Sequence, residues 1–436
     1  MARPRKNAAK VQGSLLAPDE VAEIPVEEQP YPLPEGWKWV RLGDITEIVG
    51  GGTPSSRVKE YYDNGNIPWL SPADLSDYHE IYICRGKKML TVKGLNSSSA
   101  RMIPAETVCL SSRAPIGYVV IAKNPLCTNQ GFKSFLPSHL YIPKFLYWYL
   151  KGNKPLLESY ASGTTFLELS GAKAAQIEFP LPPLGEQQRI VDRIESLFAK
   201  LDEAKAKAEA VLDGFEIRKA AILHKAFTGV LTAKWREEKG FSFDSWKKIC
   251  LGKILKVSSG KGLTSKNMDN SGKIPVYGGN GITGYHNQSN VVKNTIVIGR
   301  VGYYCGSVHY IKKEAWVTDN ALIVSFDRNK FESNFLFYLL LHTDLRQNDS
   351  STAQPVISGS KIYPIEITIT TNILEQQKIV RILDSLFAKE QQVKEAAESV
   401  LNQIELMKKA ILARAFRGEL GTHGSARDTL QNNGSM

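Results

Sequence analysis

The strongest constraint on how this chain can fold is an internal repeat. Residues 186–191 (Glu-Gln-Gln-Arg-Ile-Val) return as residues 375–380 (Glu-Gln-Gln-Lys-Ile-Val), 189 residues later. The same separation relates Leu-Phe-Ala-Lys at residues 197–200 and 386–389, and Ala-Phe-x-Gly at residues 226–229 and 415–418. A match without insertions over roughly forty residues indicates one rigid element that occurs twice.

Each copy of the repeated element has the pattern of a long amphipathic helix. Apolar residues recur at alternating spacings of three and four, with polar residues between them, and the one polar member of each series is Arg218 or Glu390. Such heptads predict two helices of about 40 residues that form a coiled coil. The predicted contact residues are Ile194, Leu197, Leu201, Val211 and Phe215 in the first copy, and Leu383, Leu386, Val393, Val400 and Ile404 in the second.

The segments before the two helices are related more loosely, and both mix short β-rich runs with one helix, near residues 144–150 and 334–341. We therefore expect an α/β protein with two mixed α/β domains separated by a long antiparallel two-helix coiled coil. The order domain, helix, domain, helix makes the second helix return along the first, with a pseudo-two-fold internal repeat. The predicted boundaries are a disordered leader (1–30), domain 1 (31–184), helix 1 (185–229), domain 2 (230–373), helix 2 (374–418) and a disordered tail (419–436).

Three sets of positions in the two predicted domains are aligned by this weaker repeat. Ser112-Arg113 is aligned with Gly299-Arg300, Trp69 with Tyr277, and Asn129-Gln130 with Asp319-Asn320. The distances between aligned segments vary, which indicates that loop lengths differ while the scaffold recurs. The side chains of the two domains have diverged.

Composition narrows the class of protein. The chain has 436 residues with a net charge of +11, which favours a polyanionic partner such as nucleic acid. Neither a membrane-spanning segment nor a secretory signal is recognisable, so a cytoplasmic protein is expected. The five cysteines are scattered and never form C-x-x-C, which favours free thiols over disulfides or zinc.

The sequence contains no convincing catalytic or cofactor motif. Residues 279–284 match G-x-G-x-x-G, but the polar segment that follows is a poor helix start and no acidic residue stands at the required distance. A P-loop and an Asn/Asp-Pro-Pro-Tyr/Phe tetrad are absent, and the seven histidines have no metal-ligand spacing. We therefore expect a non-catalytic chain without metal or bound cofactor.

Loops rich in glycine, hydroxyl, amide and basic side chains are the candidates for DNA contact, because these groups bind phosphates and base edges. The loop at residues 50–57 and the arginines after two strands are the clearest cases, although turns, ion pairs and a buried Trp69 remain equally simple interpretations. The predicted DNA-binding residues are Gly51, Gly52, Thr53, Ser55, Arg57, Trp69, Ser111, Arg113, Gln130, Lys261, Lys266, Tyr277, Asn280, Arg300, Tyr303 and Asn320.

These features together resemble one known family, the specificity subunits of type I restriction–modification systems. The most telling segments are residues 180–191 (Pro-Leu-Pro-Pro-Leu-Gly-Glu-Gln-Gln-Arg-Ile-Val) and the two Ala-Phe-x-Gly sites, with support from residues 33–37 and 111–117. The chain departs from the family in its charged leader and at residues 371–374, where Thr-Asn-Ile-Leu replaces the proline-rich approach.

The resemblance implies a function and a set of partners. Each domain would read half of a bipartite, asymmetric target in double-stranded DNA, with an unread spacer between the halves. Two adenine-N6 methyltransferase subunits would dock on the helices and bind S-adenosylmethionine themselves, and restriction or translocase subunits would join them. Two other classes remain open, a coiled-coil scaffold whose domains bind protein or sugar, and an enzyme with an unrecognised site.

Overall fold

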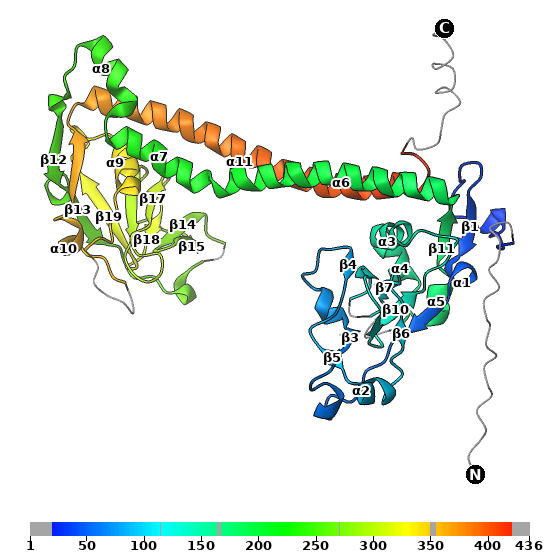
Figure 1. Ribbon diagram of the computed structural model, residues 1–436. Coiled ribbons are helices and arrows are strands. Elements are labelled where there is room, and N and C mark those ends of the chain that lie inside the picture. Colours follow the sequence, from blue (N-terminus) through cyan, green and yellow to red (C-terminus); the bar gives the residue numbers. More distant parts are fainter. Residues whose placement is uncertain (1–19, 114, 164–166, 270, 349–354, 421–436) are drawn as a thin grey trace, which may run out of the picture. The chain divides into compact units, whose positions relative to one another are not determined.

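A computed structural model describes residues 20–113, 115–163, 167–269, 271–348 and 355–420. Ala114 of the 111–117 motif and most of the two predicted tails lie outside the described residues. The chain forms two compact units, the first from Met1–Ala206 with Asn402–Met436 and the second from Lys207–Leu401. Each unit is an α/β domain with part of each long helix (Figure 1).

The first unit contains two main sheets and one strand pair. The five-stranded sheet has the order β2-β10-β7-β8-β4, the four-stranded sheet has the order β5-β3-β9-β6, and β1 pairs with β11. The strands are β1 (Lys38–Arg41), β2 (Ile48–Gly50), β3 (Ile67–Leu70), β4 (Tyr82–Ile83), β5 (Met89–Leu90), β6 (Met102–Ile103), β7 (Val108–Ser111), β8 (Val119–Ala122), β9 (Leu126–Thr128), β10 (Phe132–Phe135) and β11 (Glu178–Leu181).

One amphipathic helix, α3 (Pro143–Gly152), organises the core of the first unit. It packs against β7 and β8, and the ring of its buried Phe145 lies 5.6 Å from Phe179 of β11 and 5.1 Å from Phe416. Phe416 lies near the end of the described residues, so this core combines segments that are far apart in the sequence. The other helices are α1 (Leu42–Ile45), α2 (Val92–Asn96), α4 (Lys154–Ser159) and α5 (Gly171–Ala175), with 3-10 turns at Val26–Glu28, Lys59–Tyr61 and Pro72–Leu75.

Part of the predicted disordered leader is folded. Val21 and Ile24 are each 4% exposed, and the Ile24 amide donates to the Trp39 carbonyl at 2.8 Å. Tyr31 donates to the Phe416 carbonyl at 3.1 Å, beneath the guanidinium of Arg417. The prediction of disorder is therefore wrong for residues 20–30, because two apolar side chains and one aromatic ring anchor this segment.

The second unit repeats this plan with different loops. β12 pairs with β20, a four-stranded sheet has the order β13-β19-β16-β17, and a three-stranded sheet has the order β15-β14-β18. Its strands are β12 (Trp246–Cys250), β13 (Leu255–Ser259), β14 (Ile274–Gly278), β15 (Gly281–His286), β16 (Thr295–Gly299), β17 (Val308–Ile311), β18 (Trp316–Val317), β19 (Ala321–Phe326) and β20 (Glu366–Thr370).

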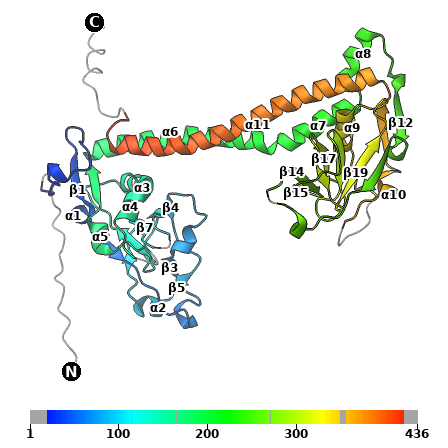
Figure 2. The same ribbon diagram turned by 180° about the vertical axis from the view of Figure 1, so that it is seen from behind.

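Helix α9 (Ser333–His342) takes the place of α3 in the second unit. It lies against the sheet that contains β16 and β17 (Figure 2) and buries Phe335, Leu336, Leu339 and Leu340. The remaining helices of this unit are α8 (Ala233–Lys239) and α10 (Gly359–Ile362), with 3-10 turns at Val230–Thr232, Phe243–Ser245, Leu251–Lys253 and Ser265–Asn267.

The repeated element forms α6 (Leu184–Asp213), α7 (Phe215–Phe227) and the 44-residue α11 (Ile373–Phe416). In the first unit Lys408 pairs with Asp202, and in the second Phe215 lies by Lys394 and Arg218 by Glu390, so the helices are antiparallel as predicted. The described helices contain no apolar stretch long enough to cross a membrane.

The first copy was expected to be one continuous helix, but it is interrupted at Gly214. The Arg218 guanidinium folds back over this residue, so that a Cβ at position 214 would lie 2.6 Å from Arg218 Nη1. Arg218 Nη2 donates to the Val211 carbonyl at 3.0 Å, and Nε donates to Glu390 Oε2 at 2.8 Å. The two polar exceptions in the predicted heptads therefore pair with each other beside the break.

The contact line of α11 differs from the predicted one. Val393 and Val400 are 46% and 39% exposed, whereas Lys394 and Leu401 are half-buried. The Lys394 ammonium lies 5.1 Å from the Phe215 ring, and a long aliphatic stem on an aromatic face contributes to packing as an apolar residue does. The pattern missed this because it counted lysine as polar; Leu383 and Ile404 are buried as predicted.

The Glu-Gln-Gln repeat has a structural explanation. Gln187 accepts from the Ile142 amide at 2.8 Å and donates to the Leu140 and Pro182 carbonyls at 3.0 and 2.9 Å. Its counterpart Gln376 accepts from the Glu332 amide at 2.9 Å and donates to the Lys330 and Thr370 carbonyls. Each buried amide thus joins the start of the long helix to the segment before α3 or α9, which explains why both copies keep glutamine.

Candidate nucleic-acid interface

In the first unit, the candidate interface is built around the loop that follows β2, residues 51–57. The Gly52 amide donates to the Thr128 carbonyl at 2.9 Å. A Cβ on Gly51 would clash with the carbonyls of Thr128 and Asn129, and one on Gly52 would clash with the backbone of Ser99 and Ala100. The two glycines therefore let the loop approach this chain's own backbone, while their contact with DNA stays a prediction.

Trp69 supports this loop from beneath. It is 6% exposed, its indole N–H donates to the Gly52 carbonyl at 3.0 Å, and Tyr62 packs edge-on against its ring. Tyr62 also donates to the Pro54 carbonyl at 2.6 Å. The predicted contact between Trp69 and DNA is therefore wrong, because the buried ring has no face free for stacking.

The polar side chains of the loop remain exposed. Thr53, Ser55 and Arg57 face solvent, and so does Gln130 of the β9–β10 loop. The Thr53 hydroxyl donates to the side-chain oxygen of Gln130, so two predicted residues that are 77 positions apart lie together. This leaves hydroxyl, amide and guanidinium groups on one rigid support, which is the chemistry that binds phosphates and base edges.

Ser111 and Arg113 have structural partners. Ser111 is fully buried, donates to the Pro115 carbonyl at 2.7 Å and accepts from the Tyr118 amide at 2.9 Å, so its predicted DNA contact is wrong. The half-buried Arg113 pairs with Glu168 at 3.4 Å, an ion pair of little energetic weight at this exposure.

Lys133 of β10 was not predicted as a site residue. Its side chain is buried, and its ammonium donates to Ser112 Oγ at 3.2 Å. The pKa of Lys133 lies below its ordinary value, mainly because of burial; the nearby Glu168 carboxylate raises this pKa, and the Arg113 guanidinium lowers it. A lysine inside an apolar strand pattern is the signal that would have identified this cationic position beside the loop.

In the second unit, the loop after β13 is held in the same way by a different residue. The Lys261 amide donates to the Val317 carbonyl at 2.9 Å, and the indole of Trp316 donates to the Lys261 carbonyl at 3.0 Å. The side chains of Lys261 and Lys266 are exposed. These two predicted phosphate ligands thus project from an anchored loop.

A cavity of about 750 Å³ lies beside this loop and brings together several predicted residues. Asn280, Tyr303 and Asn320 line it, as do Asp319 and the buried Thr318. Tyr303 is 87% exposed and meets Tyr304 edge-on, with ring centroids 5.1 Å apart. Thr318, Thr283 and Tyr304 were not predicted; because their loops are distant in sequence, no local pattern reveals their proximity.

Tyr277 and Arg300 are set back from this cavity's lining. Tyr277 is half-buried, burial raises its pKa, and its ring lies 6.4 Å from His309. Arg300 Nη1 donates to Ser259 Oγ at 3.1 Å and to the Asp319 carbonyl at 3.4 Å. Arg300 therefore fixes the loop that carries Asp319.

The three predicted alignments between the units are each wrong by one residue. In the parallel pairs of β3 with β9 and of β14 with β18, Leu70 lies opposite Thr128 and Tyr277 opposite Val317, so Tyr277 corresponds to Leu70. The backbone amide of Ser112 donates to the Gly131 carbonyl, and the backbone amide of Arg300 donates to the Asn320 carbonyl. Arg300 therefore corresponds to Ser112. These pairings match Val317 with Thr128 and Asn320 with Gly131. The two residues between them therefore align as well, Thr318 with Asn129 and Asp319 with Gln130.

The one-residue error in these alignments matters because a shift of one residue along a strand turns the side chain to the opposite face of the sheet. Matching residue types in a diverged sequence cannot detect such a shift. Trp69 and Trp316 show the result, since different strands supply the indole that anchors corresponding loops.

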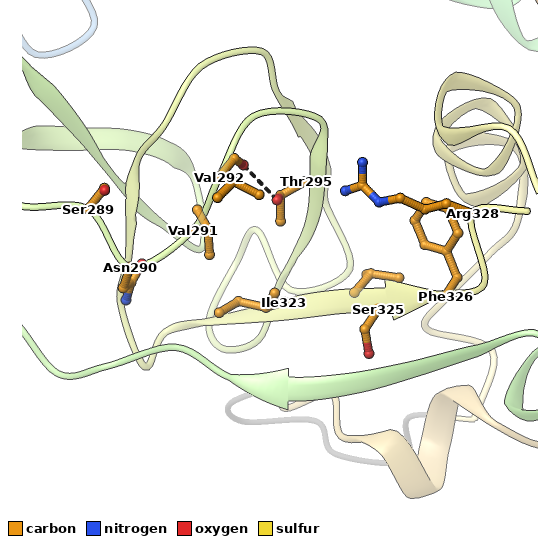
Figure 3. Close-up of a pocket in the computed structure, with 10 residues that line it drawn as sticks. Ser289, Asn290, Val291, Val292, Thr295, Ile323, Ser325, Phe326 and Arg328 are labelled. Atoms are coloured by element: carbon orange, nitrogen blue, oxygen red, sulfur yellow. Dashed lines mark hydrogen bonds between the residues drawn. The ribbon is translucent and has the colours of Figure 1, made fainter.

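A second hollow of the second unit, about 520 Å³, gathers none of the predicted residues (Figure 3). Its polar side chains are already engaged. Asn290 donates to the Val317 carbonyl and accepts from its amide, Thr295 donates to the Val292 carbonyl at 2.7 Å, and Arg328 donates to the Asn294 carbonyl at 3.0 Å. We assign this hollow to the support of β16 and β19.

Nothing in the described part of the chain gathers three or more His, Cys, Asp or Glu side chains in a geometry that could hold a metal ion. All five cysteines are free thiols. Burial raises the pKa of both Cys109 and Cys127 to about 12, so these thiols stay protonated at neutral pH.

Comparisons with known proteins agree with this architecture. The family model described as "Type I restriction modification DNA specificity domain" matches residues 34–212 and 244–403. The type I restriction enzyme MjaIX specificity subunit of Methanocaldococcus jannaschii is 38% identical over 237 residues, 52% of this chain and 54% of that protein. The EcoprrI specificity subunit of Escherichia coli is 26% identical over 80% of this chain and 86% of its own length.

Two solved structures share the fold. One, described as the structural basis underlying complex assembly and conformational transition of the type I R-M system, has a TM-score of 0.70 and 20% identity and covers 90% of this chain and 100% of its own. The HsdS subunit from Thermoanaerobacter tengcongensis has a TM-score of 0.62 and 21% identity over the same shares of each chain. With the family match over both domains, the chain belongs to the DNA specificity subunits of type I restriction–modification systems, which are the non-catalytic subunits of these enzymes.

Proposed function

We propose that this subunit reads a bipartite, asymmetric target in double-stranded DNA, one half-site with each α/β domain, and leaves the spacer between them unread. The observation that carries the proposal is the duplicated loop support with unlike side chains. The anchored loops present Thr53 and Gln130 in the first unit, and they present Lys261 and Asp319 in the second. Because base recognition depends on such groups, the two half-sites should differ in sequence.

The long helices are proposed to dock two adenine-N6 methyltransferase subunits, to which restriction or translocase subunits can add. Exposed apolar residues on α11, among them Val393, Val400, Leu406 and Met407, support this proposal, because exposed apolar groups in a row favour a protein partner. S-adenosylmethionine is assigned to those partners. The residues of this chain then supply recognition and positioning.

Mapping of methylated adenines tests the proposed function directly. DNA from cells that express the methyltransferase subunits with this chain should carry N6-methyladenine at one two-part sequence with a fixed gap. Cells that lack this chain should lose that mark completely. Methylation that persists without this chain, or a mark at a single continuous sequence, would contradict the proposal.

DNA binding by the full chain should weaken steeply with salt. If exposed cations such as Arg57, Lys261 and Lys266 contact phosphates, binding releases counterions, and a set of about 6 phosphate contacts lowers affinity by roughly 1,000-fold between 50 and 200 mM salt. A titration of fluorescent duplex DNA at four salt concentrations measures the slope. A flat response would favour a scaffold that binds protein or sugar.

A further inference from the structure

We infer that the cavity of about 750 Å³ in the second unit receives one unstacked base of the bound DNA, and that this base carries an exocyclic amino group. The inference deepens the proposed function and rests on it. It identifies the cavity as a site for an extruded nucleotide, in addition to the contacts that a stacked base pair makes at the rim.

The walls of the cavity allow close approach by a planar ligand. Gly262, Gly278, Gly279 and Gly302 contribute backbone without side chains. The volume lies within the range of about 300–1,000 Å³ that is typical of small-molecule sites. The cavity can therefore admit a base and its sugar without rearrangement of the surrounding strands.

A buried hydroxyl in the lining of the cavity lacks a partner among the described residues. Thr318 is 4% exposed, and its Oγ1 forms no hydrogen bond within the described residues. At the corresponding position of the first unit, Asn129 Oδ1 accepts from the Gly131 amide at 2.8 Å and so closes on its own loop. A buried polar atom without a partner is costly, and a ligand that bonds to it removes that cost.

The depth of Thr318 distinguishes an unstacked base from a stacked one. A base pair that remains in the helix meets exposed rim residues such as Asn280, Asp319 and Asn320. Thr318 is 4% exposed and its Oγ1 has almost no accessible surface, so only a base that leaves the stack and displaces the adjacent side chains can bring its edge to this hydroxyl.

The polar groups around Thr318 select the class of base. Asp319 supplies a carboxylate acceptor, and the side-chain amides of Asn280 and Asn320 and the hydroxyl of Thr283 can each accept as well. The Asp319 carboxylate only accepts, so it favours a base with an exocyclic amino group, which adenine, cytosine and guanine carry. A thymine presents carbonyl oxygens, which the Asp319 carboxylate repels.

Tyr303 is placed to compensate for the lost stacking. Its ring is 87% exposed at the rim, on a turn in which Gly302 and Gly306 adopt left-handed backbone conformations, with φ of +80° and +87°. The Cys305 amide donates to the Gly302 carbonyl at 3.0 Å, and the Gly306 amide donates to that of Gly299 at 2.8 Å. A rigid turn that presents an aromatic ring can stack on the base or fill its place in the helix.

Fluorescence of 2-aminopurine in bound DNA tests the inference. Duplexes that carry the mapped target, with the probe next to each adenine, cytosine or guanine of the second half-site in turn, are titrated with the full-length chain. We expect the fluorescence to rise several-fold at one position, where the probe loses its stacking neighbour. Tyr303→Ala should abolish this rise and weaken binding by about 10-fold, whereas Tyr285→Ala, which alters a 45% exposed tyrosine outside the cavity, should change neither.

A second variant separates the cavity from its rim. Thr318→Val keeps the side-chain shape and removes the hydroxyl. It should weaken binding by about 10-fold for duplexes that carry the base identified by the fluorescence rise, and it should not affect recognition at any other position. Sequence-specific binding with flat fluorescence at every position, or full binding by both variants, would overturn the inference and leave the proposed function intact. If the unaltered chain shows no sequence-specific binding, both the inference and the proposed function are overturned.

Discussion

Replacing Glu375 with leucine is expected to destabilise the second unit by about 3–5 kcal/mol, because it leaves the buried charge of Arg236 without a partner. Glu375 is fully buried near the start of α11, and Arg236 of α8 is 8% exposed. Arg236 Nη1 donates to Glu375 Oε1 at 2.5 Å and to Thr232 Oγ1 at 2.8 Å, and Nη2 donates to the Gly229 carbonyl at 2.8 Å.

The remaining capacity of the Glu375 carboxylate is filled by neutral donors. Thr232 donates to Oε1 at 2.7 Å, Thr370 donates to Oε2 at 2.9 Å, and the indole of Trp246 donates to both oxygens at 3.1 Å. The network joins α8, β12, β20 and α11 of the second unit. Its loss should therefore loosen the β12–β20 pair before the four-stranded sheet of the same unit.

The same network predicts a pH dependence. Burial by itself would raise the pKa of Glu375, but the hydrogen bonds from Thr232, Arg236, Thr370 and Trp246 outweigh it, and the pKa lies below its ordinary value of 4.5. A depressed pKa contributes stability that is present above pH 4.5 and is lost as the pH falls through the folded-state pKa. The stability difference between the unaltered chain and Glu375→Leu should accordingly shrink in acid.

Hydrogen exchange of the full chain measures this effect unit by unit, which a single melting temperature of a two-unit protein cannot do. Protection of β12 and β20 amides should fall in Glu375→Leu, while β1 and β11 of the first unit should be unchanged. Glu398→Gln is the matched control, because this helix residue forms an exposed i,i+4 pair with Lys394 at 4.0 Å, and its loss should change stability by less than about 0.5 kcal/mol. Equal effects of the two substitutions would contradict the assignment.

Lengthening both long helices by one heptad should lengthen the unread spacer by about 3 base pairs and leave both half-sites unchanged. Seven residues add about 10 Å of helix, and each base pair along one strand spans about 3.4 Å. A whole heptad keeps the contact residues on the same side of each helix. Matched positions are the bonds between Lys205 and Ala206 and between Ile404 and Glu405, near the pair of Asp202 with Lys408.

Methylation mapping in cells that carry the lengthened chain gives the new spacing. The matched control is a heptad inserted into α11 alone, which puts the helices out of register and should abolish methylation at either spacing. An unchanged spacer in the doubly lengthened variant would show that the helices do not set the distance between half-sites.

The sequence alone determined the architecture. The gap-free repeat predicted two long antiparallel helices, and Leu383 and Ile404 are buried in them as the heptads require. The segments before the long helices predicted short strands with one helix each, and the helices expected near residues 144–150 and 334–341 are α3 and α9. Periodicity succeeds here because it reports which side of an element meets its neighbour, a property of consecutive residues.

Only the tertiary structure decided which side chains occupy corresponding places and which remain free. It assigned Trp69 and Ser111 to the support of loops, moved the contact line of α11 from Val393 to Lys394, and paired Arg218 with Glu390. It also aligned Thr318 with Asn129 and left the Thr318 hydroxyl, in the lining of a cavity, without a partner among the residues that the structure describes. These outcomes depend on contacts between residues far apart in the chain, and in a strand a displacement of one residue exchanges the buried and exposed faces.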